Sequence, residues 1–299
     1  MRAFKQVDVF TPEAGLGNAL AVVLEGEGLS DEAMQRFARW TQLSETTFLC
    51  PPTAPGADYR LRIFTPGGEL PFAGHPTLGS CHAWLEAGGQ PQGEFIVQEC
   101  AVGLVRIRRE GPRLAFAAPP VARSAIEPEL LHDIMAALGV RAEQVRASQR
   151  LDNGPVWHGV LLDEPETVLA LRPDFARLAE MKVKVGIAAA YTRSASPPLI
   201  LRSNREARAF AQTLAQADAD LEVRAFVPDV GVPEDPVTGS LNASLAQWLM
   251  AEGLMPSDYL AAQGACLGRA GQVHLTQDAL GQVWVGGESV TCIDGQLHW

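Results

Sequence analysis

Short stretches in which apolar and polar residues alternate follow one another through the first 120 residues, a pattern typical of β-strands with one buried face. Turns rich in Gly and Pro separate these stretches. The strands expected from the pattern lie at 4–10, 18–25, 44–50, 59–66, 94–100, 103–110 and 113–119. Since the later strands follow one another as a meander, the pattern favours an α+β fold over alternating parallel β-α-β units.

Two helices interrupt these strands. Ser30 can cap a helix that spans about 30–43, with Phe37 and Trp40 on one apolar side. A second helix is expected at 76–87, because a proline suits its first turn and a glycine follows its last.

The second half of the chain repeats this order of elements. We expect helices at 127–139, 174–181 and 238–253, and strands around 156–162, 166–172, 185–192 and 221–228. A loop rich in Pro and Gly again leads into the last helix, as it does before the helix at 76–87.

Identical residues recur between the two halves. A shift of 162 positions aligns Arg62 with Arg224, Phe64 with Phe226, Pro66 with Pro228 and Pro71 with Pro233. A shift of 164 positions aligns segment 80–89 with segment 244–253. The repetition predicts two halves of matching fold, one made of 1–118 with 280–299 and the other of 119–279. At 299 residues, two domains are also the expectation from length alone.

The bulk composition narrows the class of protein. A hydrophobic content of 47% is enough for two cores, and a formal net charge of −11 with pI near 5.0 argues against nucleic-acid or membrane partners. An acidic protein that binds a small anionic substrate needs local positive potential inside its site.

No cofactor is expected. The five cysteines are widely spaced and form no zinc-binding or disulfide pattern, and no Gly-rich phosphate-binding motif is present. No metal ligands are therefore assigned. The chain also has no apolar run of about 18 residues and no signal-peptide pattern at its start, so we expect a cytoplasmic protein.

Two loop-to-helix turns occupy matching places in the halves, at 73–77 and 235–240. Each combines Gly, Pro and hydroxyl residues, which suit close backbone approach and helix capping. Because the start of a helix has free N–H groups and a partial positive charge, two such starts in one cleft would bind a carboxylate without Lys or Arg.

Three side chains near these turns can carry chemistry, although each also has a structural interpretation. His75 lies in a turn, where it can act on a substrate or be a buried structural histidine. Asp235 can be a cap or turn residue before a proline. Glu45 opens a strand, where a glutamate usually points to solvent.

Four motifs, at 17–24 (GNALAVVL), 43–49 (LSETTFL), 67–79 (GGELPFAGHPTLG) and 234–240 (EDPVTGS), resemble the phenazine-biosynthesis F (PhzF) family in order and spacing over essentially the whole chain. The resemblance implies a diaminopimelate epimerase-like fold, with two pseudo-symmetric halves that each wrap a curved barrel-like sheet around a central helix. It also implies an active site between the halves and a homodimer.

The same resemblance implies roles for single residues. Related epimerases and racemases use two cysteines at the starts of the central helices, and the corresponding positions here are Ala73 and Asp235, so that pair is missing. A family glutamate that falls on Glu45 would be the general acid and base, and Asp235 and His75 would hold and polarise the substrate. The substrate-binding residues implied are Gly74, Gly239, Ser240, Ser44 and Asn18.

The expected activity is therefore a cofactor-independent isomerisation that moves a proton within a small carboxylate-bearing substrate, as in trans-2,3-dihydro-3-hydroxyanthranilate isomerase, within a biosynthetic pathway. Two alternatives stay open. One is an amino-acid racemase or epimerase, which the missing cysteine pair disfavours. The other is a binding or scaffold protein of the same fold, which would not need a proton carrier.

Overall fold

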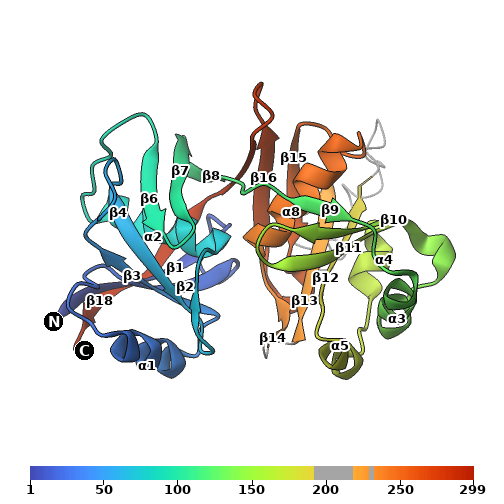
Figure 1. Ribbon diagram of the computed structural model, residues 1–299, viewed down its shortest axis with the longest axis horizontal. Helices are drawn as coiled ribbons and strands as arrows, with labels where there is room; N and C mark the ends of the chain where they lie inside the picture. The colour runs from blue at the N-terminus through green and yellow to red at the C-terminus, as the bar shows by residue number, and fades with distance from the viewer. Residues whose placement is uncertain (192–217, 229–231) are drawn as a thin grey trace, which may run out of the picture.

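The computed structural model describes residues 1–191, 218–228 and 232–299, which form two lobes joined near the middle (Figure 1). Both chain ends lie in the same lobe. All described strands belong to one hydrogen-bonded network of 18 strands. In the described ranges, no helix has the length and apolar character that a membrane span requires.

The first lobe is a strongly curved sheet around helix α2. Its elements are β1 (Arg2–Val9), β2 (Asn18–Val23), α1 (Asp31–Thr41), β3 (Glu45–Cys50), β4 (Tyr59–Phe64), β5 (Glu69–Leu70), α2 (Gly74–Glu86), β6 (Ile96–Cys100), β7 (Gly103–Glu110) and β8 (Arg113–Ala117). Helix α2 is rich in small residues and buried along most of its length, which lets the strands close around it. A side chain at Gly79, for example, would meet Leu20 and Val9 at 2.7 Å.

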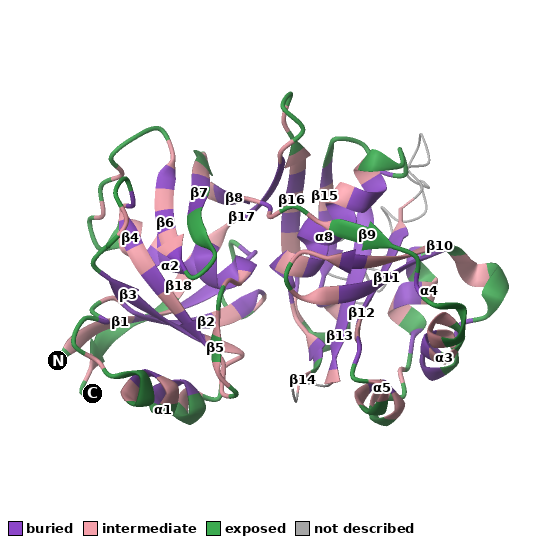
Figure 2. Cartoon of the chain, viewed as in Figure 1, coloured by how far each residue is buried: buried purple, intermediate pink, exposed green. Residues whose placement is uncertain are grey.

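The second lobe repeats the arrangement around helix α8. Its elements are β9 (Ala122–Ser124), α3 (Pro128–Leu138), η1 (Ala142–Gln144), β10 (Val145–Asp152), β11 (Val156–Leu162), α4 (Pro165–Ala170), α5 (Phe175–Met181), β12 (Lys184–Ala190), β13 (Leu221–Val227), β14 (Val232–Asp235), α8 (Gly239–Ala251), β15 (Asp258–Gln263), η4 (Ala265–Leu267), β16 (Gly271–Gln277) and β17 (Val283–Gly287). Buried positions concentrate on α8 and the strand faces around it (Figure 2).

Strand pairing is equivalent in the two lobes. β2 runs parallel to β3 and β11 parallel to β12, and each second strand then pairs antiparallel with β4 or β13. In β4, Phe64 lies opposite Glu69, and in β13 Phe226 lies opposite Glu234. The predicted alignment of Phe64 with Phe226 is therefore confirmed for these strands.

The two central helices match at a different shift. α2 begins at Gly74 and α8 at Gly239, which is 239 − 74 = 165 positions. A glycine with positive φ follows each helix at the same shift, Gly88 at 91° and Gly253 at 68°. The shift of 164 expected for the helices is wrong by one position, because the chain from Phe226 to Gly239 is three residues longer than the chain from Phe64 to Gly74, not two.

The last strands link the lobes. β17 pairs with β16 of the second lobe and with β8 of the first. The final strand, β18 (Ser289–Leu297), pairs with β1, so the chain returns to the first lobe. Because β17 pairs with both lobes, the boundaries at 118/119 and 279/280 stay a prediction.

Two sequence expectations were wrong in detail. Segment 166–172 was expected as a strand, but α4 covers most of it and packs Val168 into the outer core of the second lobe. In α1, Ser30 caps the helix by accepting from Ala33 N, as expected, and Phe37 is buried. Trp40 is 70% exposed instead and stacks on Phe37.

Candidate active site

The first residues of α2 and α8, Gly74 and Gly239, lie in close backbone contact. A Cβ atom on Gly74 would lie 3.1 Å from the Cα of Gly239, and a Cβ atom on Gly239 would lie 3.1 Å from the Cα of Gly74. The same Cβ atom on Gly74 would also lie 2.9 Å from the ring of Phe116. Only glycine allows this approach, so the backbones of the two first turns face each other across the junction of the lobes.

Asn18 joins the lobes at this point. Its Nδ2 donates to Asp235 Oδ1 at 3.0 Å and to the carbonyl of Val237 at 2.9 Å, and it lies 3.4 Å from His75 Nδ1. The loop before it is fixed by Asp8, which accepts from two backbone N–H groups. A first-lobe amide thereby holds the second-lobe carboxylate.

His75 lies in the first turn of α2 and is buried. Its Nε2 is 3.3 Å from Glu45 Oε2, and in the described part of the chain neither atom has a hydrogen-bond partner of good geometry. Burial lowers the pKa of His75 to about 4, although the charges of Asp235 and Asp8 oppose the shift. The imidazole is therefore neutral at pH 7, with one nitrogen available to donate and one to accept.

Glu45 is the first residue of β3, and only 16% of its side chain is exposed. Burial raises its pKa, while a hydrogen bond to Ser44 and the ammonium of Lys184 oppose the increase. The structural interpretation, a glutamate pointing to solvent, is therefore wrong. Its carboxyl group takes up and releases protons closer to neutrality than an exposed glutamate would.

Asp235 ends β14 and is held from its own lobe. Thr238 donates to Asp235 Oδ2 at 2.6 Å, and Gln263 donates to both the Asp235 carbonyl and the Thr238 hydroxyl. Burial raises the pKa of Asp235 to about 6, and the nearby charge of Glu45 adds to the increase. Two carboxyl groups of perturbed pKa thus lie beside one neutral imidazole. We call Asn18, Glu45, His75 and Asp235 the helix-start cluster.

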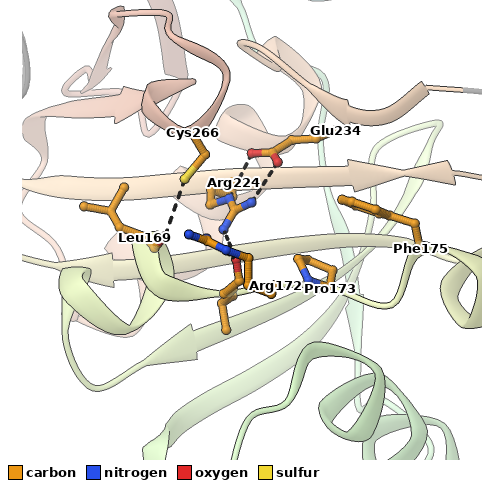
Figure 3. Close-up of a pocket in the computed structure, with 8 residues that line it drawn as sticks. Leu169, Arg172, Pro173, Phe175, Arg224, Glu234 and Cys266 are labelled. Carbon is orange, nitrogen blue, oxygen red and sulfur yellow. Dashed lines mark hydrogen bonds and ion pairs between the residues drawn. The ribbon is translucent and has the colours of Figure 1, made fainter.

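The direction of Asp235 is set by its neighbour in β14. Arg224 grips Glu234 with two hydrogen bonds, at 2.9 and 2.8 Å, on the wall of a cavity of about 390 Å³ that also includes Phe175 and Cys266 (Figure 3). Successive strand residues point to opposite faces, so anchoring Glu234 there turns Asp235 toward the helix starts. None of the cluster residues lines this cavity.

The other expected site residues border the cluster. Ser44 is half-buried beside Glu45, and Gly74 and Gly239 form the helix contact. Ser240 is held by the second lobe: its hydroxyl accepts from Trp157 Nε1 at 3.2 Å, and its carbonyl accepts from Asn153.

Ala73 and Asp235 do not occupy matching places. Ala73 directly precedes α2, whereas the residue that directly precedes α8 is Thr238, three positions after Asp235. Neither residue next to a helix start carries a thiol.

Sequence reasoning missed the residues that hold the cluster and Ser240 in place, which are Asp8, Asn153, Trp157, Thr238 and Gln263. Of these, only Thr238 lies inside a recognised motif, and its hydroxyl three positions after an acidic residue was a usable signal. Within the described ranges, no group of three or more His, Cys, Asp or Glu side chains is arranged to hold a metal ion.

Comparisons with known proteins agree with this architecture. A solved structure described as a predicted epimerase, from Pseudomonas aeruginosa, matches with a TM-score of 0.77 at 23% identity, over 100% of both chains. A solved structure described as a probable proline racemase, from Agrobacterium radiobacter, shares the fold as well, with a TM-score of 0.61 at 12% identity over 99% of this chain and 93% of that chain. The α+β, diaminopimelate epimerase-like class expected from the sequence is therefore confirmed.

Curated relatives cover nearly the whole chain. Antisense-enhancing sequence 1 of Schizosaccharomyces pombe is 33% identical, covering 98% of each chain. Trans-2,3-dihydro-3-hydroxyanthranilate isomerase of Pseudomonas aeruginosa is 29% identical, covering 100% of each chain. The family model of phenazine biosynthesis-like proteins, PhzC-PhzF, matches residues 7–295. The chain therefore belongs to the PhzC-PhzF family of phenazine biosynthesis-like proteins.

Proposed function

We propose that this protein is a cofactor-independent isomerase that moves a proton within a small carboxylate-bearing substrate, with Glu45 as the proton carrier. The observation that carries the proposal is the buried contact between Glu45 Oε2 and the neutral imidazole of His75, beside two facing helix starts. The isomerase names of several relatives support the same class of reaction.

The reaction needs one carboxyl group. Ionised Glu45 takes a proton from a substrate carbon, and the electron pair left behind shifts the neighbouring double bond. The protonated carboxyl then returns the proton to a carbon two or four atoms away on the same face, so a 1,3- or 1,5-shift results with no net change in atoms. A carboxyl with a raised pKa suits both steps, since it must accept and donate at similar pH.

The remaining groups of the site hold the substrate. His75 and Asp235 lie where they can polarise substrate oxygen or nitrogen atoms. The N–H groups of Gly74, Gly239 and Ser240 lie in the first turns of their helices, where intrahelical partners are missing, and point along the helix dipoles. They would take the substrate carboxylate and stabilise negative charge as it develops in the transition state.

The test measures proton transfer itself, as deuterium uptake, so that the product need not be known in advance. Purified protein is incubated in D₂O with a panel of small unsaturated carboxylates, beginning with trans-2,3-dihydro-3-hydroxyanthranilate, and deuterium uptake is measured by mass spectrometry and NMR. We expect uptake at the carbon that receives the proton with wild-type protein, because the Glu45 carboxyl exchanges its proton with D₂O before returning it to the substrate. Glu45→Gln should lose about 10²–10⁴-fold of that rate, because Gln fills the same space but cannot carry a proton.

Glu129→Gln, on the exposed start of α3, serves as the matched control and should keep full activity. Thermal melting of both variants separates lost chemistry from lost folding. A loss of less than tenfold in a folded Glu45→Gln protein would contradict the proposed role. Uptake with inversion at a single carbon would instead favour the racemase alternative.

A further inference from the structure

We propose that Lys184 is a further substrate-binding residue, which takes the carboxylate of the substrate from the side of the second lobe, opposite Glu45. The inference rests on the proposed function and deepens it, because it names the charged side chain that recognises the anionic group. It follows from strand register, from the face on which Lys184 lies, and from the absence of an ion pair to Lys184 among the residues that the structure describes.

Lys184 occupies the place in the second lobe that Glu45 occupies in the first. Glu45 opens β3 and pairs with Leu20 of the parallel strand β2. Lys184 opens β12 and pairs with Trp157 of the parallel strand β11. The next residue of each strand, Thr46 or Val185, lies opposite the matching phenylalanine of β4 or β13. At equivalent positions of the internal repeat, the first lobe therefore has a carboxylate and the second lobe has an ammonium group.

The side chain of Lys184 lies on the inner face of its sheet. Gly186, two positions along the strand, packs against helix α8 so closely that a Cβ atom there would meet Leu241 at 2.2 Å. Since side chains alternate along a strand, positions 184 and 186 share this face, and Lys184 lies nearer the start of α8. Its registered neighbour, Trp157, donates to the hydroxyl of Ser240 in the first turn of α8.

Among the residues that the structure describes, the half-buried Lys184 makes no ion pair and no side-chain hydrogen bond. The helix-start cluster otherwise contains two acidic groups and a neutral imidazole, so it offers no cation of its own. The ammonium is near enough to Glu45 to oppose the rise in its pKa. An unpaired cation at such a position is suited to an anion that arrives with the substrate.

This assignment orients the substrate. If its carboxylate lies between Lys184 and the N–H of Ser240, the rest of the molecule extends toward Glu45 across the junction of the lobes. Substrates without an anionic group would then lose binding while the proton-transfer machinery stays intact.

Binding and kinetics of Lys184→Met and Lys184→Arg test the assignment. Met keeps the length and apolar stem of Lys without its charge, and Arg keeps the charge. Calorimetry measures the affinity of each protein for anthranilate and for its uncharged analogue anthranilamide, and kinetics separate KM from kcat on the carboxylate that shows deuterium uptake. Melting temperatures check that both variants fold.

We expect wild-type protein and Lys184→Arg to prefer anthranilate to anthranilamide. Lys184→Met should lose about 10- to 100-fold in anthranilate affinity and raise KM by a similar factor, with little change in kcat or in anthranilamide affinity. No measurable preference of the wild-type protein for anthranilate, or equal losses for both ligands in Lys184→Met, would overturn the assignment. If Lys184→Met loses anthranilate affinity but neither the wild-type protein nor the variants show deuterium uptake, Lys184 is upheld as the anion site and the isomerase function is refuted.

Discussion

At the scale of single residues, the two carboxyl groups of the site share one electrostatic environment. Glu45 and Asp235 come from different lobes, and the charge of Glu45 adds to burial in raising the pKa of Asp235. Asn18 and Thr238 each donate to one oxygen of Asp235, which favours its ionised form. The result is a pair of acids whose protonation in the folded state is linked.

The raised pKa of Asp235 predicts how stability changes with pH. Between about pH 4 and pH 6 the folded protein keeps a proton that the unfolded chain releases, so this group makes folding less favourable as pH rises through that window. In Asp235→Asn this contribution is absent. The free energy of unfolding of the variant, relative to wild type, should therefore increase by about 2 kcal/mol from pH 4 to pH 7.

Urea unfolding at several pH values measures this difference without depending on catalysis. Asn loses one of the two hydrogen bonds that Asp235 accepts, so the variant can be less stable at every pH. Only the slope is diagnostic, and parallel curves for the two proteins would show that Asp235 titrates normally.

At the scale of secondary-structure elements, the site depends on how closely two helices approach. The free N–H groups of both first turns serve one substrate only if the helix starts stay in contact. Gly74 and Gly239 make that contact possible, and Phe116 limits any retreat of α2.

Gly74→Ala should therefore damage both stability and activity. The new methyl group would lie 2.9 Å from Phe116 and 3.1 Å from Gly239 Cα, so the helices must separate or the ring must move. Overpacking of this kind costs about 1–3 kcal/mol, measurable by denaturant unfolding. Gly68→Ala, in the loop that precedes α2, is the matched control, because no atom lies within 4 Å of its new methyl group. Equal stability of the two variants would show that the helix contact is loose.

Most of the secondary-structure elements were predictable from the sequence, and the predictions that were wrong have physical causes. Ser30 as a cap, the alternating strands and the two loop-to-helix turns follow from local preferences. The strand expected at 166–172 became α4, since burial of Val168 against the sheet outweighs the strand-like composition of the segment. The supporting residues Trp157 and Gln263 could not be found, because they reach the site through tertiary contacts between distant segments.

At the scale of the whole molecule, the internal repeat has the same Arg–Glu ion pair in both lobes, but the two pairs differ in burial. Arg62 grips Glu69 as Arg224 grips Glu234, and each guanidinium lies about 5 Å from the centre of a phenylalanine ring in its own strand. The first pair is partly exposed. The second is almost fully buried, with side-chain exposures of 5% and 6%.

The difference in burial between the two ion pairs predicts that matched substitutions will lower the free energy of unfolding by different amounts. Arg224→Met leaves the buried carboxylate of Glu234 without its partner and should cost about 3–5 kcal/mol of unfolding free energy. Arg62→Met removes two partly exposed pairs, with Glu69 and Asp31, that water can replace, so about 0–1 kcal/mol is expected. Denaturant unfolding compares the two variants directly, and equal losses would contradict the burial argument. Loss of the Glu234 anchor should also weaken substrate binding through Asp235.

The pairing of β18 with β1 has a consequence for how the protein is made. Arg2 lies opposite Leu297, so one edge of the first strand stays unpaired until residues 289–297 have been synthesised. The strands of the second lobe from β10 to β16 pair with each other and can assemble earlier on the ribosome. The lobe translated first is therefore the last to be completed, and until then its open strand edge is a place where a chaperone or another nascent chain can bind.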